Sequence, residues 1–151
     1  MVLVHASCVD LEGKGVLLRG TPGAGKSDLA LRLIEGGAKL VADDQVALTN
    51  TGEALLAAPP ARIAGLLEVR GVGIVSMAFV HQCPVHLLVD LVQPDTVERM
   101  PEATTVELCG HRIPHVALAP FEASTPAKVR LSLSHAAAAG QDVQATRSVG
   151  R

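Results

Sequence analysis

The phosphate-loop pattern G-x-x-x-x-G-K-[ST] is matched by the stretch Gly20-Thr21-Pro22-Gly23-Ala24-Gly25-Lys26-Ser27. Glycines in such a loop let the backbone bend so that successive N–H groups point inward at an anion. A helix starting near Lys26 adds the positive end of its dipole at the same place. We therefore predict that this loop binds a nucleotide, with Lys26 on the β- and γ-phosphates and the Ser27 hydroxyl as a ligand of Mg²⁺.

A phosphate-binding loop of this type lies between a buried strand and a helix, and the segments on either side of residues 20–27 fit both. The apolar run Val16–Leu18 comes before it, and the spacing of apolar residues after it predicts a helix over 26–35. Gly36-Gly37 supplies the left-handed stop that helices favour, and Leu40–Ala42 is predicted to be a short buried strand. Strand, helix and strand together predict a βαβ unit and a sheet that is at least partly parallel. The alternative, a glycine-rich turn that binds nothing, does not account for this setting.

The remainder of the chain is expected to form strands rather than repeated βα units. The alternation over 2–11 predicts a strand, followed by a turn at Gly13-Lys14-Gly15. Turn signals at Asn50-Thr51-Gly52 and Cys109-Gly110-His111 predict two hairpins. In the second hairpin we expect His111 and His115 to face solvent.

Length and composition indicate one domain and exclude several classes of protein. The 151 residues are 48% hydrophobic and 19% charged, enough for a core and too apolar for a disordered chain. We expect residues 1–139, ending in a helix over 128–139, to form the domain, and 140–151 to be a disordered tail. No apolar run reaches the length of a membrane span, and no secretory signal is visible at the start.

Charge and aromatic content bear on possible partners. The net charge of −2 gives no reason to expect nucleic acid or anionic lipid as a partner. Two Phe and no Trp or Tyr argue against a surface that stacks the bases of single-stranded nucleic acid. We therefore expect no nucleic-acid partner, no membrane association and a cytoplasmic location.

The acidic pair Asp43-Asp44 ends the strand that follows the predicted helix. Adjacent residues of a strand point to opposite faces, so only one of the two can face the phosphates. The carboxyl end of that strand should lie near the loop that holds Ser27. A carboxylate there can bind Mg²⁺ or accept a proton from an attacking hydroxyl. The alternative is a solvated turn with an N-cap aspartate.

Taken together, these residues resemble the HPr kinase/phosphorylase family. The resemblance rests on His5, the loop 20–27, the stretch Leu40–Asp44 and the stretch Leu67–Ile74, within about residues 2–120. It implies an α/β fold: a P-loop kinase domain with a partly parallel, mixed central sheet and antiparallel hairpin additions, HPr kinase/PEP carboxykinase-like. It also implies that the chain is the C-terminal catalytic domain only, and that it assembles as a homo-oligomer, a hexamer in this family.

The function that this resemblance implies is phosphorylation of a protein serine. The family uses ATP and Mg²⁺ to phosphorylate a serine of HPr, the phosphocarrier protein of the sugar phosphotransferase system, or of a related carrier. It also removes that phosphate with inorganic phosphate, which releases pyrophosphate. Longer members carry a Gly-Arg-Asn segment associated with this second reaction, and here the corresponding residues 120–128 read differently.

The resemblance also assigns roles to single residues. Asp44 resembles the general base that takes the serine proton, and His5 the histidine beside it. Glu68 resembles a second Mg²⁺ ligand in addition to Ser27. Arg99 resembles an arginine that, with Lys26, neutralises charge during transfer.

Each of these roles has a plainer alternative. Glu68 could form an ion pair with Arg70, Arg99 could be a solvated charge, and His5 could serve packing or lie at the surface. Two rival functions are a small-molecule kinase that uses the same loop and a regulatory module that binds ATP without turnover. The combination of Asp44, Glu68 and Arg99 favours catalysis, because a sensor needs no base.

Overall fold

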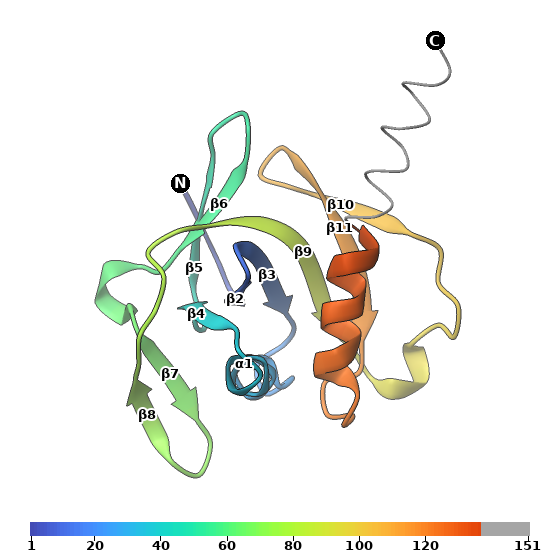
Figure 1. Ribbon diagram of the computed structural model, residues 1–151, viewed down its shortest axis with the longest axis horizontal. Coiled ribbons are helices and arrows are strands. Elements are labelled where there is room, and N and C mark those ends of the chain that lie inside the picture. The colour runs from blue at the N-terminus through green and yellow to red at the C-terminus, as the bar shows by residue number, and fades with distance from the viewer. Residues whose placement is uncertain (137–151) are drawn as a thin grey trace.

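A nine-stranded mixed sheet with two helices against it forms the body of the molecule (Figure 1). The computed structural model describes residues 1–136. Its strands are β1 (Val2–Val4), β2 (Ser7–Leu11), β3 (Lys14–Arg19), β4 (Lys39–Ala42), β5 (Val46–Asn50), β6 (Leu55–Ala58), β7 (Leu66–Val69), β8 (Gly73–Ser76), β9 (Cys83–Leu91), β10 (Thr104–Leu108) and β11 (His111–Leu118). Its helices are α1 (Lys26–Glu35), the short 3₁₀ turns η1 (Ala61–Ile63) and η2 (Pro94–Thr96), and the helical residues 125–136.

The long strand β9 is the centre of the sheet and explains its mixed character. One edge of β9 pairs in parallel with β3. The other edge pairs first with β6, antiparallel, and then with β11, parallel. The predicted hairpins are present as β5–β6 and β10–β11, while β7 and β8 form a separate two-stranded sheet. The prediction of a partly parallel, mixed sheet with hairpin additions is confirmed.

The predicted βαβ unit differs from the expectation in one respect. The strands β3 and β4 are both antiparallel to β2, so they run in the same direction, but β2 lies between them. The helix α1 therefore crosses over one intervening strand. The sequence pattern predicts only the order of strand, helix and strand along the chain. It does not predict that another strand, here β2, lies between the two parallel strands in the sheet.

The strand expected over 2–11 is broken in two. Its first part, β1, pairs with β5, whereas its second part, β2, pairs with β3 and β4. The hairpin turn after β2 lies at Glu12-Gly13, both with positive φ, rather than at 13–15. Because β1 and β5 pair beyond the end of β4, His5 comes to lie opposite the residues that join β4 to β5.

Both faces of the sheet are buried, which is why its strands read as continuous apolar runs. In β3, Leu18 belongs to the cluster beneath α1 and the helical residues 125–136, and Leu17 belongs to the cluster on the opposite face. The predicted C-terminal helix is present, starting at residue 125 rather than 128, and residues 137–151 lie outside the described part. Within residues 1–136, no helix is long and apolar enough to cross a bilayer.

His115 does not face solvent as expected. Its Nε2 lies 2.7 Å from Oδ2 of Asp90, and Arg19 donates to both oxygens of the same carboxylate, at 2.7 and 2.9 Å. These three residues come from β11, β9 and β3, which the register of the parallel pairs places side by side. Burial alone would raise the pKa of Asp90, but the hydrogen bonds from Arg19 and His115 lower it below its usual value.

We expect Asp90→Asn to destabilise the fold, and to do so most at neutral pH. A carboxylate whose folded pKa is lowered contributes stability above its unfolded pKa, near 3.9, and loses that contribution as the pH falls through the folded value. Because the group is partly exposed, the expected loss is only about 1 kcal/mol. Urea unfolding of the unaltered protein and of Asp90→Asn, carried out from pH 7 to pH 3, measures this loss of unfolding free energy. A difference that did not shrink toward low pH would contradict the assignment.

Candidate active site

The phosphate-binding loop joins β3 to α1 and has the backbone geometry that its glycines permit. Gly23 and Gly25 have φ values of 80° and 102°, and α1 begins at the next residue, Lys26. The left-handed φ of Gly25 favours glycine, and a Cβ atom there would lie 2.8 Å from the ring of Phe121, which would have to shift. Because α1 begins where the loop ends, the N–H groups of its first turn, which lack partners within a helix, are available to an anion in the loop.

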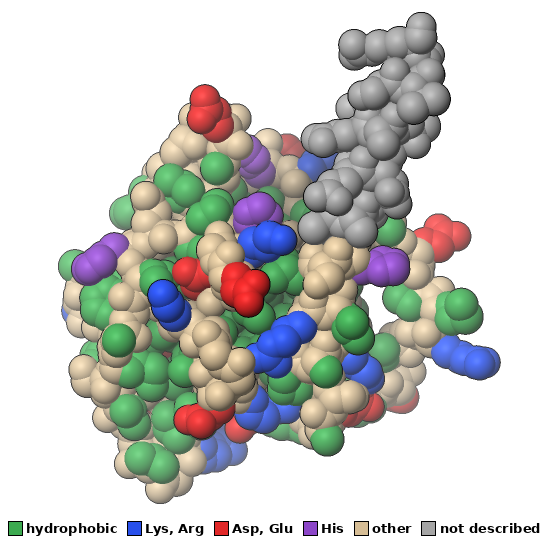
Figure 2. Space-filling model, viewed as in Figure 1, with side chains coloured by type: hydrophobic (Ala, Val, Ile, Leu, Met, Phe, Trp, Pro, Cys, Tyr) green, Lys and Arg blue, Asp and Glu red, His purple; other side chains and the backbone are tan. Residues whose placement is uncertain are grey.

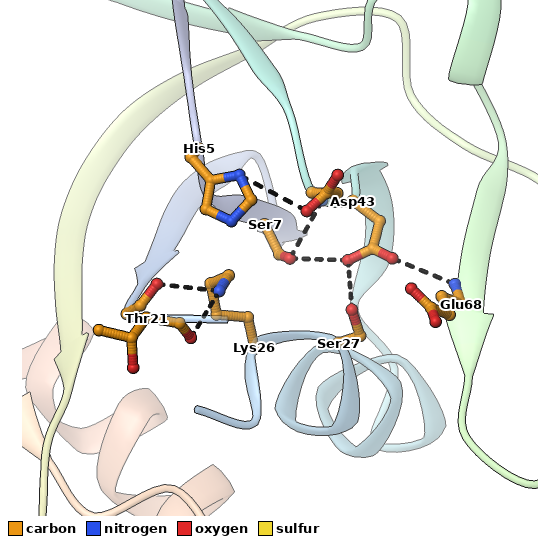
Figure 3. Close-up of polar contacts among 9 residues, drawn as sticks. His5, Ser7, Thr21, Lys26, Ser27, Asp43 and Glu68 are labelled. Carbon is orange, nitrogen blue, oxygen red and sulfur yellow. Dashed lines mark hydrogen bonds and ion pairs between the residues drawn. The ribbon is translucent and has the colours of Figure 1, made fainter. Parts of the chain in front are cut away.

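Lys26 is buried and its ammonium lies inside this loop (Figure 3). Its Nζ donates to the carbonyl oxygens of Gly20 at 2.9 Å and Thr21 at 3.1 Å. Burying a charged ammonium is costly unless its donors find partners, and the two carbonyls provide them. The loop thus holds a full positive charge where an anion bound by the backbone N–H groups would sit.

Asp43 is the hub of the site (Figure 3). Its Oδ1 accepts hydrogen bonds from the hydroxyls of Ser7 and Ser27, each at 2.7 Å, and its Oδ2 accepts one from the backbone N–H of Glu68 at 3.1 Å. The residue is only 5% exposed. One buried carboxylate therefore joins the start of β2, the first turn of α1, the end of β4 and the strand β7.

The side chain of Asp44 pairs with His5, while its backbone N–H donates to the hydroxyl of Ser7 at 3.5 Å. Its φ of 71° is left-handed, a conformation that aspartate tolerates better than most residues, and it turns the chain out of β4. Its side chain is 67% exposed, with Oδ1 3.5 Å from Nδ1 of His5. The expectation that the two aspartates point in different directions is confirmed: Asp43 faces Ser27, and Asp44 pairs with His5 at the surface.

Glu68 lies at this site, but Arg99 is not joined to it. The side chain of Glu68 points toward Asp43 and Ser27 (Figure 3). In residues 1–136 no ion pair joins Glu68 to Arg70, so the plainer alternative for Glu68 is not seen. Arg99 is exposed in the segment after η2. Among the described residues, no hydrogen bond or ion pair connects Arg99 to the phosphate-binding loop.

The oxygen atoms around Ser27 are of the kind that Mg²⁺ prefers. The hydroxyl of Ser27 and the carboxylates of Asp43 and Glu68 are hard oxygen ligands, and Mg²⁺ in phosphate-transfer sites is bound by one or two carboxylates together with substrate oxygens. The described residues contain no group of three His, Cys, Asp or Glu side chains able to hold a metal without a substrate. The oxygen ligands of Ser27, Asp43 and Glu68 fit a Mg²⁺ ion that substrate oxygens also bind.

Sequence reasoning did not identify two features of the site. Ser7 is fully buried and donates to Asp43, yet nothing in its local sequence distinguishes it from any other strand serine. The role of Asp43 as hub also required the structure, although the acidic pair itself was a visible signal. Only the contact with Ser27 shows which of the two aspartates faces the loop.

The family model and the relatives that match this chain all belong to one protein family. Residues 1–129 match the family model described as HPr Serine kinase C-terminal domain. An HPr kinase/phosphorylase of Chloroherpeton thalassium is 36% identical over 126 residues, which cover 76% of this chain and 37% of that protein. One from Malacoplasma penetrans is 32% identical over 124 residues, covering 74% and 41%. The chain thus spans about two fifths of the length of these relatives.

A solved structure shows the same fold. The Hpr(Ser) kinase/phosphatase from Coxiella burnetii superposes with a TM-score of 0.85, covering 99% of this chain and 98% of that one. The two sequences are 24% identical, so the likeness establishes the architecture alone.

Proposed function

Because the chain belongs to the HPr serine kinase C-terminal domain family, we propose that it phosphorylates a serine of an HPr-type phosphocarrier protein with ATP. In this reaction the serine Oγ forms a bond to the γ-phosphorus, the bond from that phosphorus to ADP breaks, and the serine proton passes to a protein base. The observation that supports the proposal most strongly is the 2.7 Å hydrogen bond from Ser27 to Asp43. It joins the phosphate-binding loop to the acidic end of β4.

We assign the charge and metal-binding roles to residues around the loop. Lys26 would leave its two carbonyl partners and contact the β- and γ-phosphates. Ser27, Asp43 and Glu68 would hold Mg²⁺, which when bound neutralises phosphate charge. Arg99 would add a further positive charge from the segment after η2, where its side chain is exposed.

We assign the base to Asp44 rather than to Asp43. Asp43 is buried and both of its oxygens already accept hydrogen bonds, so they are poorly placed to take the proton of the substrate serine. The carboxylate of Asp44 is largely exposed, and a serine carried on another protein can reach it from solvent. His5, 3.5 Å away, would orient that carboxylate.

The test is to incubate the protein with ATP, Mg²⁺ and purified HPr-type carrier proteins and to locate new phosphate by mass spectrometry. We expect a single phosphoserine on one carrier. Transfer to a small molecule, or ATP binding without transfer to any carrier, would instead support the small-molecule kinase or the sensor.

Two further parts of the proposal need separate measurements. Adding inorganic phosphate to the phosphorylated carrier, with detection of pyrophosphate, tests the reverse reaction. Assembly as a homo-oligomer, a hexamer by resemblance to the family, stays a prediction that light scattering of the purified protein would check.

A further inference from the structure

Phe121 is an exposed aromatic side chain next to the phosphate-binding loop. It is 67% exposed, and among the described residues it belongs to neither of the two hydrophobic clusters. The chain has only two Phe and no Trp or Tyr, so aromatic rings are scarce in it. An exposed ring outside the core contributes little to folding, because most of its apolar surface stays in water.

The position of the ring is set by the topology of the sheet. The strands β3 and β11 both run parallel to β9, so the loops that follow them emerge at the same edge. The loop after β3 is the phosphate-binding loop, and the segment after β11 carries Phe121. The two meet at Gly25, where a Cβ atom would lie 2.8 Å from Cζ and 2.9 Å from Cε1 of the ring.

The backbone around Phe121 is held firmly against α1. The guanidinium of Arg32 donates to the carbonyl oxygens on both sides of it, those of Pro120 and Glu122. Asp28, one turn earlier on α1, accepts a hydrogen bond from Nε of Arg32 at 3.0 Å and so fixes the guanidinium. The backbone that carries the ring is therefore anchored to the same helix that begins at Lys26.

We propose that Phe121 forms a nucleobase subsite, in which the exposed face of its ring stacks on the base of the nucleotide bound by the loop 20–27. This inference rests on the proposed function, because it requires a nucleoside triphosphate in the loop. The base of such a nucleotide is separated from the β-phosphate by the α-phosphate and the ribose, so its partner must stand at the rim of the loop, as Phe121 does. Stacking uses the π-face that every base has, so the subsite takes a nucleobase without reading its edges.

The first test compares a ligand that has a base with one that lacks it. We expect Phe121→Ala to weaken the binding of ATP by about 5- to 100-fold and to leave the binding of inorganic tripolyphosphate within about twofold, measured by titration calorimetry. Leu131→Ala, which removes an apolar side chain of similar exposure (68%) from the helical residues 125–136, is the matched control and should change neither affinity. Equal weakening of both ligands, or unchanged binding of ATP, would overturn the subsite.

A second test uses the absence of tryptophan from the chain. In Phe121→Trp the new indole is the sole fluorophore of its type, and we expect ATP to quench its emission while tripolyphosphate at saturation does not. Equal responses to the two ligands would overturn the stacking contact. If the unaltered protein bound neither ligand, the proposed function would fail together with the subsite. If it bound ATP through Lys26, shown by loss of binding in Lys26→Ala, without any dependence on Phe121, the subsite alone would fail.

Discussion

Asp44→Asn is expected to reduce phosphorylation of the carrier serine by at least about 100-fold while ATP binding changes by less than about threefold. An amide cannot take the serine proton, and a general base accounts for two to four orders of magnitude in rate. The side chain of Asp44 is exposed and pairs with His5, whereas Ser27 bonds to Asp43, so replacing Asp44 should leave the nucleotide-binding loop intact. Phosphoserine formation under single-turnover conditions, followed by mass spectrometry, measures the first effect, and calorimetry with ATP measures the second.

The matched control for this substitution is Glu35→Gln, which removes an exposed carboxylate at the opposite end of α1 from the loop. It should leave the labelling rate unchanged. Labelling by Asp44→Asn at the rate of the unaltered protein would exclude Asp44 as the base. Loss of ATP binding in the same variant would instead place Asp44 in the nucleotide site, which would contradict our assignment as well.

Asp43→Ala is expected to lower the free energy of unfolding by about 3 kcal/mol, the largest stability effect in the site. The substitution leaves the hydroxyls of Ser7 and Ser27 and the backbone N–H of Glu68 without their acceptor. The Ser7 hydroxyl is buried and the other two donors are partly buried, and an unpaired polar group of this kind costs on the order of 1 kcal/mol. Urea unfolding followed by circular dichroism measures the loss.

Ser7→Ala provides the comparison, because it removes one donor and leaves Asp43 with the other two. We expect that variant to lose only about 1 kcal/mol. The double variant should lose less than the sum of the two single losses, since the shared hydrogen bond can be removed only once. Equal losses for Asp43→Ala and Ser7→Ala would show that Asp43 does not act as the hub of these contacts.

Much of the local structure could be read directly from short stretches of sequence. The loop 20–27, the helix over 26–35 and the hairpins around 50–52 and 109–111 depend on glycines, caps and apolar spacing among near neighbours, and the structure has all of them. The divergence of Asp43 and Asp44 is expected from strand alternation, but both residues follow the end of β4, and the left-handed φ of Asp44 turns the chain there. These features need no knowledge of distant partners.

The remaining features depend on pairing between distant segments, and local patterns carry no information about it. The insertion of β2 between β3 and β4, the break that brings His5 to Asp44, and the contact of His115 with Asp90 all arise from strand registers set far apart in the chain. The choice of Asp43 as the partner of Ser27 follows from the same pairing. Which side chains share the phosphate-binding edge is therefore decided by long-range packing, because that edge is assembled from the ends of separate strands.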